Sequence, residues 1–237
     1  QHLFYAHRVG HDDPRRLVDA GPPTVVLVGP DMTIEDCAIV SSGMPFDRAY
    51  GRHNRIERNR LDIGRNGWNA MWRTEETVIE GNEIQGRDLE ANYGGAQQKA
   101  YRLYFANNYW HDGYGADREA LTFDTPYLPV WMGQAEAVDG RRLRTRGRKW
   151  MADTLQEMVV MIAGGKGVGQ YIQIESNSEE EIILERPWAV EPDSTSVLAV
   201  RVDKSDVVIT RNRMVDASVA VQLYAMSYGF IVDGNRA

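Results

Sequence analysis

Apolar and polar positions follow one another in the same order at six places along the chain: residues 34–39, 56–61, 79–84, 104–109, 209–214 and 232–237. Each copy begins and ends with an apolar residue, and five of the six carry Asn at the fourth position. The fourth positions are Cys37, Asn59, Asn82, Asn107, Asn212 and Asn235, with spacings of 22, 23, 25, 105 and 23 residues. This period predicts coils stacked along an axis, and the long spacing predicts an insert of about 80 residues.

The shared fourth position predicts a ladder of side-chain amides. Strands of stacked coils lie about 4.8 Å apart, so an Asn in each coil reaches the Asn of the next. Asn also tolerates the left-handed backbone that a sharp corner needs. Cys37, as the first and smallest member, fits the buried end of the ladder as an unreactive thiol.

Leucine-rich repeats are the main alternative, because they share this period and an Asn or Cys position. Their Leu-x-x-Leu-x-Leu framework is absent, and residues 62–74 and 85–100 are polar with no helical period. The chain instead resembles the right-handed parallel β-helix superfamily, the pectate-lyase-like fold. The segments that carry this resemblance are 33–39, 54–62, 77–86, 101–113, 206–215 and 229–236. The resemblance implies an all-β solenoid and leaves the reaction open.

The repeat divides the chain into coils at 1–124, an insert at 125–204 and further coils at 205–237. The insert shows short strands separated by turns, which predict a small antiparallel β-barrel-like module. The predicted strands are 130–138, 142–145, 158–162, 170–176, 181–184 and 197–202.

The insert contains a glycine-rich stretch, Gly164 to Gln170, that looks at first like a phosphate loop. In a phosphate loop Ser or Thr follows the Lys and a helix follows, whereas here Gly167 and a strand follow Lys166. The glycines therefore predict a tight turn. With Arg186-Pro-Trp188 and the Pro-Asp-Ser-Thr-Ser stretch ending at Ser196, this region resembles an insert of bacterial β-helix proteins.

The net charge of −7 argues against a nucleic-acid partner, because neutralising phosphates needs a basic face. One local exception is the basic run 141–149, in which six of nine residues are Arg or Lys. Two readings stay open for it: a solvated hairpin, or a contact for an anionic polymer.

No membrane span is visible in the hydropathy of the chain, and the single Cys37 forbids an internal disulfide. No signal peptide is visible at Gln1. Because both ends cut through the expected stack without a polar cap, we expect a segment of a longer protein whose remaining coils are its partners. The expected location is extracellular or periplasmic, with the signal peptide upstream.

Candidate chemistry gathers in the coil that precedes the insert. The expected catalytic residues are His111, Asp112, Asp117, Glu119 and Asp124. Paired carboxylates are what glycoside hydrolysis needs, one as acid and one as base or nucleophile. Each residue also has a plain structural reading: a turn former, a surface histidine or a solvated charged face.

Substrate contacts are expected from the same coil and the coils before it. The expected substrate-binding residues are Glu90, Arg118, Tyr114, Trp72 and Tyr93. Aromatic faces pack well on the apolar side of a pyranose ring, and their structural reading is loop packing.

These features favour a carbohydrate-active protein that cleaves a polysaccharide or oligosaccharide, with hydrolysis favoured over elimination. A lyase would instead use Arg or Lys as base, sometimes with calcium held by carboxylates. Otherwise we expect no cofactor, and the His7, His11, Asp12 and Asp13 group is not expected to bind metal because Pro14 follows it. The alternative function is a non-catalytic glycan-binding, adhesin-like or tail-spike-like scaffold.

Overall fold

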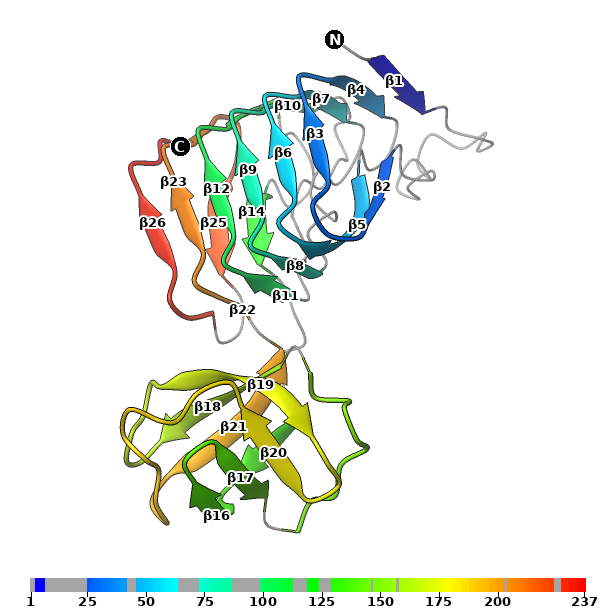
Figure 1. The fold of residues 1–237 in the computed structure, drawn as a ribbon. Coiled ribbons are helices and arrows are strands. Elements are labelled where there is room, and N and C mark those ends of the chain that lie inside the picture. The colour runs from blue at the N-terminus through cyan, green and yellow to red at the C-terminus, as the bar shows by residue number, and fades with distance from the viewer. Residues whose placement is uncertain are drawn as a thin grey trace, which may run out of the picture. The chain divides into compact units, whose positions relative to one another are not determined.

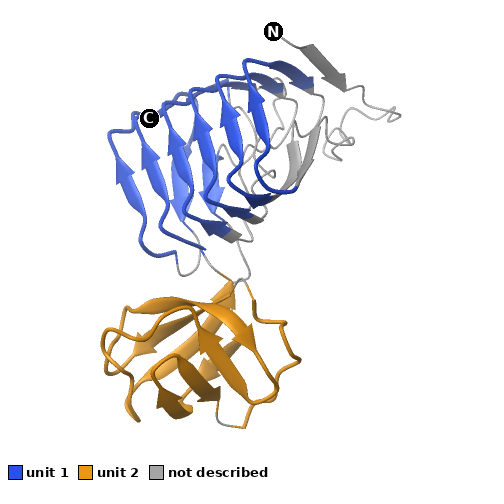
Figure 2. Ribbon diagram, viewed as in Figure 1, with its two compact units in different colours: residues 1–125, 204–237 blue, residues 126–203 orange. Residues whose placement is uncertain are grey.

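The computed structural model is built from β-strands. It describes residues 3–6, 25–41, 46–63, 73–86, 99–112, 119–123, 129–145, 147–156, 158–202, 204–223 and 227–237. None of these ranges contains a helix, so none supplies a helix able to cross a membrane. The chain forms two compact units: unit 1, residues 1–125 and 204–237, and unit 2, residues 126–203 (Figure 2).

Unit 1 contains three parallel sheets, and each coil adds a strand to sheets B, C and A in turn (Figure 1). Sheet A has the order β1 (Leu3–Ala6), β4 (Ala38–Ser41), β7 (Arg60–Ile63), β10 (Glu83–Gly86), β13 (Tyr109–His111) and β24 (Arg213–Met214). Sheet B has the order β2 (Val25–Val28), β5 (Phe46–Arg52), β8 (Arg73–Glu75), β11 (Lys99–Tyr101) and β22 (Lys204–Ser205). Sheet C runs through β3 (Thr33–Glu35), β6 (Arg55–Glu57), β9 (Val78–Glu80), β12 (Tyr104–Ala106), β23 (Val208–Thr210) and β26 (Ile231–Asp233).

A further parallel pair, β14 (Glu119–Phe123) with β25 (Val219–Leu223), completes the strands described in unit 1. The predicted parallel, all-β arrangement is therefore confirmed. Parallel neighbours need a crossover between them, and here the rest of the coil supplies it.

Much of the core of unit 1 comes from the middle residues of its short inner strands. In sheet C, Ile56, Ile79 and Phe105 pair in register and are almost completely buried. In sheet A, Ile84 and Trp110 do the same. Since side chains alternate along a strand, the residues on either side of each buried position face outward. Burying one such apolar side chain contributes about 1.5–3 kcal/mol, so the stack is stabilised at every coil.

The Asn ladder runs through the corner between sheets C and A, and its predicted members Asn59, Asn82, Asn212 and Asn235 are confirmed. The Oδ1 of Asn82 accepts hydrogen bonds from the backbone N and the Nδ2 of Asn59, at 2.9 and 3.0 Å. Asn212 bonds in the same way to Asn235. At the other end, the backbone N of buried Cys37 donates to Asn59 Oδ1.

The prediction that Asn107 belongs to this ladder is wrong, because the neighbouring Asn108 takes the position. Asn82 N and Nδ2 donate to Asn108 Oδ1, and Asn108 N and Nδ2 donate to Asn212 Oδ1. The register explains the shift by one residue. Phe105, not Tyr104, pairs with the buried Ile79, so the fourth position of this copy is residue 108.

The left-handed backbone also lies one residue earlier than expected. It occurs at the residue before each ladder position, in the order Asp36, Arg58, Gly81, Asn107, Arg211 and Gly234, with φ from 51° to 67°. The ladder amides keep ordinary backbone and use their side chains for the stack. Left-handed backbone costs a residue with a Cβ about 1–2 kcal/mol, so each such corner needs compensating contacts.

Unit 2 is a seven-stranded antiparallel sheet that curls into a nearly closed, barrel-like shape (Figure 1). Its order is β15 (Trp131–Gly133), β21 (Val197–Val202), β18 (Met158–Gly164), β19 (Tyr171–Asn177), β20 (Glu181–Leu184), β17 (Arg142–Thr145) and β16 (Ala135–Asp139). The core includes Leu143, Trp150, Ile172 and Leu198. The predicted antiparallel strands of the insert are confirmed except at 130–138, where the single predicted strand is wrong: β15 and β16 are separate strands and pair with β21 and β17.

The glycine-rich stretch of unit 2 packs against the Pro-Asp-Ser-Thr-Ser stretch. A Cβ on Gly165, whose φ is 78°, would lie 2.0 Å from the backbone oxygen of Thr195. The Oγ of Ser196 donates to the backbone oxygen of Lys166, and the backbone N of Lys166 donates to Thr195 Oγ1. These contacts hold the two motifs together and require a glycine at position 165, so no bound nucleotide is needed to explain it.

Candidate functional site on the outer face of sheet A

The outward residues of β10 and β13 form the candidate site. Glu83 and Gln85 flank buried Ile84, and Tyr109 and His111 flank buried Trp110. The register pairs Glu83 with Tyr109 and Gln85 with His111, so the four outward side chains form a two-by-two grid. Parallel stacking therefore brings together residues that lie about one coil apart in the sequence.

His111, one of the four members of this grid, contacts two carboxyl groups. Its Nδ1 is 2.9 Å from Asp112 Oδ2, and its Nε2 is 3.2 Å from Glu83 Oε1. Only 15% of the His111 side chain is exposed, against 42% for Glu83 and 36% for Asp112. An imidazole that carries one proton donates at one nitrogen and accepts at the other, so one ring bridges both carboxyl groups.

Asp112 occupies the corner at the end of β13, with φ of 58°. Short polar residues adopt this backbone conformation readily, which agrees with the alternative prediction that Asp112 forms a turn. The side chain also turns back toward the sheet, because Gln85 Nε2 donates to Asp112 Oδ2 at 3.2 Å. Asp112 Oδ2 thus faces both Gln85 and His111.

Tyr109 adds an aromatic surface to the same face. Its ring stacks on the His111 imidazole with centroids 4.6 Å apart and planes 19° apart. The guanidinium carbon of Arg213, on the neighbouring strand β24, lies 5.0 Å from the Tyr109 ring centre. Such cation–π contacts contribute about 0.5–1 kcal/mol where they are exposed. The face therefore offers aromatic, cationic and acidic groups side by side.

The structure brings together two of the residues predicted from the sequence, His111 and Asp112. Glu119 opens β14, and its Oε2 accepts from Thr122 Oγ1 of the same strand at 2.7 Å. No contact of Glu119 with His111 or Asp112 occurs among the described residues. The other predicted site residues, Asp117, Asp124, Glu90, Arg118, Tyr114, Trp72 and Tyr93, lie outside the described ranges, as do His7, His11, Asp12 and Asp13.

Sequence reasoning missed Glu83, Gln85 and Tyr109. Glu83 and Gln85 flank the last apolar residue of their repeat copy. The predicted alignment of the next copy, 104–109, begins one residue too early, so it ends on Tyr109 in place of the buried Trp110. Aligning the two copies on their buried residues would have placed all four on one face.

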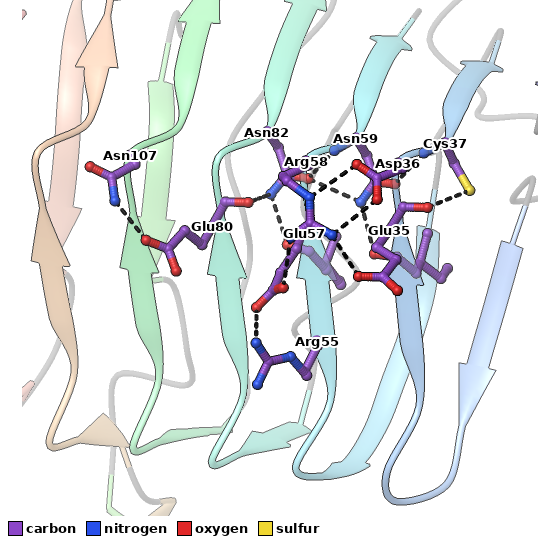
Figure 3. A network of polar contacts seen from close by, with 12 residues as sticks. Glu35, Asp36, Cys37, Arg55, Glu57, Arg58, Asn59, Glu80, Asn82 and Asn107 are labelled. Carbon is purple, nitrogen blue, oxygen red and sulfur yellow. Dashed lines mark hydrogen bonds and ion pairs between the residues drawn. The ribbon is translucent and has the colours of Figure 1, made fainter. Parts of the chain in front are cut away.

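The outer face of sheet C carries a second charged cluster, centred on Arg58 (Figure 3). Arg58 Nε and Nη2 donate to Asp36 at 3.0 Å each, and Nη2 donates to Glu35 at 2.6 Å. Arg58 Nη1 and Arg55 Nη2 also hold the carboxylate of Glu57, which is only 7% exposed. Glu35, Asp36 and Glu57 therefore each pair with an arginine guanidinium.

Hydrogen bonds from Arg58 hold the pKa of the exposed Asp36 carboxyl below its usual range. The bonds to Asp36 and Glu35 in turn raise the pKa of Arg58. A carboxylate held ionised in this way does not serve as a proton donor near neutral pH. The sheet C cluster is therefore a structural network.

Metal binding finds no support in the part of the chain that the structure describes, where no three His, Cys, Asp or Glu side chains are grouped to hold an ion. No family model matches the chain, and no curated protein is significantly similar to it. The chemistry of the candidate site is therefore argued from its own geometry.

Proposed function

We propose that unit 1 is a right-handed parallel β-helix of the pectate-lyase-like kind. The proposal is supported by coils that each add one strand to sheets A, B and C, and by the Asn ladder at one corner. Parallel strands of one sheet are joined by right-handed connections in almost all proteins. The outer faces of such a stack are then the surfaces open to a long substrate.

On this basis the outer face of sheet A binds a glycan and hydrolyses it, with Glu83 and Asp112 as the pair of carboxyl groups. The observation that carries this proposal is the single imidazole of His111 held between them. Glycoside hydrolysis needs two carboxyl groups at a fixed separation, and the shared imidazole fixes it.

With a neutral His111 ring that carries its proton on Nδ1, this nitrogen donates to ionised Asp112 and Nε2 accepts from protonated Glu83, which assigns their roles. Glu83 is the more exposed, and its Oε2 has no hydrogen-bond partner among the described residues. Glu83 acts as the acid: its proton goes to the glycosidic oxygen as the bond to the anomeric carbon breaks. Asp112 acts as the base: it takes a proton from water while the water oxygen bonds to that carbon.

The spacing of the pair predicts the stereochemical outcome. An imidazole ring and two hydrogen bonds separate the carboxyl groups, which exceeds the spacing of about 5 Å that retaining enzymes use. Water therefore attacks directly, and the configuration at the anomeric carbon inverts. For a polysaccharide substrate of this kind we infer an extracellular or periplasmic location.

A second candidate function is glycan binding without cleavage. The observation that favours it is that both ring nitrogens of His111 are occupied, while Tyr109 and Arg213 extend the face as a shallow stripe. Sugar rings pack on such stripes, and no proton transfer is needed for that role.

A glycan-degradation screen tests the proposal, using the whole chain and reading both reducing ends and the absorbance of unsaturated products. On the substrate that the parent cleaves, Glu83→Gln and Asp112→Asn should each lower kcat about 100-fold or more, because general acid and base catalysis contribute at least this much. Unsaturated products would show elimination instead and would overturn the hydrolase assignment.

Two control variants accompany this screen. Glu80→Gln lies in the same coil on sheet C, where Asn107 Nδ2 donates to it, and should leave cleavage unchanged. Glu119→Gln tests the rival carboxylate of β14. If Glu119→Gln abolishes cleavage while Glu83→Gln does not, the site lies at β14. A blank screen with a positive glycan array would establish binding only.

A further inference from the structure

Unit 2 carries a pocket whose chemistry differs from that of sheet A. It has a volume of about 330 Å³, which is in the range of ligand pockets. Its lining residues are Glu136, Arg144, Thr145, Gly147, Arg148, Lys149 and Glu180. Most of them belong to the basic run 141–149, for which the sequence left a polymer contact open.

Three of the cations in this run are already paired with nearby carboxylates. The pairs are Arg141 with Glu175, Arg142 with Glu181 and Lys149 with Glu179, at 2.7, 2.8 and 2.8 Å. Arg144 differs from them. It points outward because its neighbours Leu143 and Thr145 are buried, and it makes no ion pair with any residue that the structure describes. Its guanidinium is therefore available to a ligand.

Arg148 is held in place by the anchored loop that follows β17. Its guanidinium carbon lies 4.9 Å from the ring centre of Trp150. That ring is only 6% exposed, and its Nε1 donates to Thr145 Oγ1 at 3.0 Å. The backbone N of Trp150 also donates to the backbone oxygen of Glu179. Binding to such a preorganised cation loses little conformational entropy.

The pocket also contains acceptors. Glu136 and Glu180 are exposed, and Glu136 makes no ion pair with a described residue. Planar guanidinium groups match carboxylate and sulfate oxygens, whereas carboxylates accept hydrogen bonds from hydroxyl groups. A pocket with both kinds of group fits a ligand that carries an anion and hydroxyls on one ring. A phosphate chain would match the guanidinium groups alone and leave the two carboxylates without hydroxyl donors.

We propose that this pocket binds an anionic sugar unit of a polysaccharide. Arg144 and Arg148 hold the carboxylate or sulfate of the unit, and Glu136 and Glu180 accept hydrogen bonds from its hydroxyls. The site belongs to unit 2 alone, so it is independent of the hydrolysis proposed for sheet A. A change at Glu83 leaves it intact.

Titration of the 237-residue chain carrying Glu83→Gln with polygalacturonate, dextran sulfate, dextran and polyglutamate tests the proposal without consuming the glycan. We expect binding to polygalacturonate or dextran sulfate, and the better ligand identifies the anionic group. Adding Arg144→Gln and Arg148→Gln should weaken this binding about tenfold or more, because hydrogen bonds between charged groups are lost. Arg141→Gln, an exposed neighbour outside the pocket, should bind as before.

The acidic residues separate sugar recognition from simple charge attraction. Glu136→Gln with Glu180→Gln should weaken binding of the anionic glycan but strengthen binding of polyglutamate, since repelling charges are removed. Stronger glycan binding by this variant would overturn the proposal. Two further results would overturn it. One is that the protein with all four pocket residues intact binds polyglutamate as tightly as the glycans. The other is that Arg141→Gln loses as much glycan binding as the pocket arginine variants.

Discussion

Sheets C and A carry similar clusters, in which one side chain with several nitrogens gathers carboxyl groups from adjacent coils, but the central side chains differ. On sheet C the central side chain is Arg58, which binds Glu35, Asp36 and Glu57 (Figure 3). On sheet A it is His111, between Glu83 and Asp112. Arginine keeps its proton at all physiological pH values, whereas imidazole exchanges one near neutrality.

This difference separates a structural face from a face open to chemistry. The guanidinium of Arg58 has enough donors to bond all the carboxylates around it. The corner at Arg58 has left-handed backbone, and these contacts compensate for its cost. The imidazole of His111 has only two nitrogens, so Glu83 keeps one oxygen for another partner. Stacked coils thus place carboxylates in similar positions on both sheets. The side chain between them determines whether an oxygen stays open to a ligand.

The ladder at the corner between the two faces gives the largest expected effect. Asn108→Ala should lower the free energy of unfolding by about 3 kcal/mol, because the backbone N of buried Asn82 loses its partner and the Asn212 amide also loses a donor. Urea unfolding followed by circular dichroism measures this change.

Asn107→Gly is the matched control for this substitution. Gly81 and Gly234 occupy the same corner in other coils with a similar positive φ. Relief of the left-handed strain offsets the loss of the hydrogen bonds that Asn107 makes with Glu80 and Arg211, so we expect a change within about 1 kcal/mol. If Asn107→Gly were the more destabilising of the two, the ladder register described above would be wrong.

The second effect concerns sheet A. His111→Gln cannot hold both Glu83 and Asp112, so kcat on the substrate found by the screen should fall about 100-fold as the carboxyl groups lose alignment. KM should change little, and the urea midpoint should fall only modestly, because the His111 side chain is mostly covered but lies outside the hydrophobic core. A parallel fall in stability and activity would give His111 a structural role like that of Arg58.

The ladder shows how far the sequence alone predicts the fold. Asn59, Asn82, Asn212 and Asn235 were predicted correctly, because each follows an obvious Ile or Val by three residues. The copy with two adjacent Asn was misaligned. Tyr104 and Phe105 are both apolar enough to begin the pattern, and only packing against Ile79 selects Phe105.

The candidate site was predicted only in part for a related reason. His111 and Asp112 stand out as neighbours in the sequence, whereas Glu83 reaches them across 28 residues. Its place follows from the register of two strands, and the coil lengths between them vary. Local patterns therefore predict which residues face outward, and stacking decides which of these meet.

The smallest expected effect tests the sheet C cluster through its pH dependence. Because Arg58 lowers the pKa of Asp36, the contact stabilises the folded protein above the unfolded value of 3.8 and is lost as the pH falls through the lower folded value. The stability difference between the parent and Arg58→Gln should therefore be largest near pH 7 and shrink below about pH 4.

Urea midpoints measured at pH 7, 4 and 3 check this, with Arg211→Gln as the control. Arg211 has the same left-handed corner position, but it donates to the neutral groups Asn107 Oδ1 and Tyr104 OH. Its substitution should cost the same at all three pH values. A pH-independent cost for Arg58→Gln as well would mean that backbone strain, and not the carboxylates, sets the role of this corner, and the contrast between sheets C and A would lose its electrostatic basis.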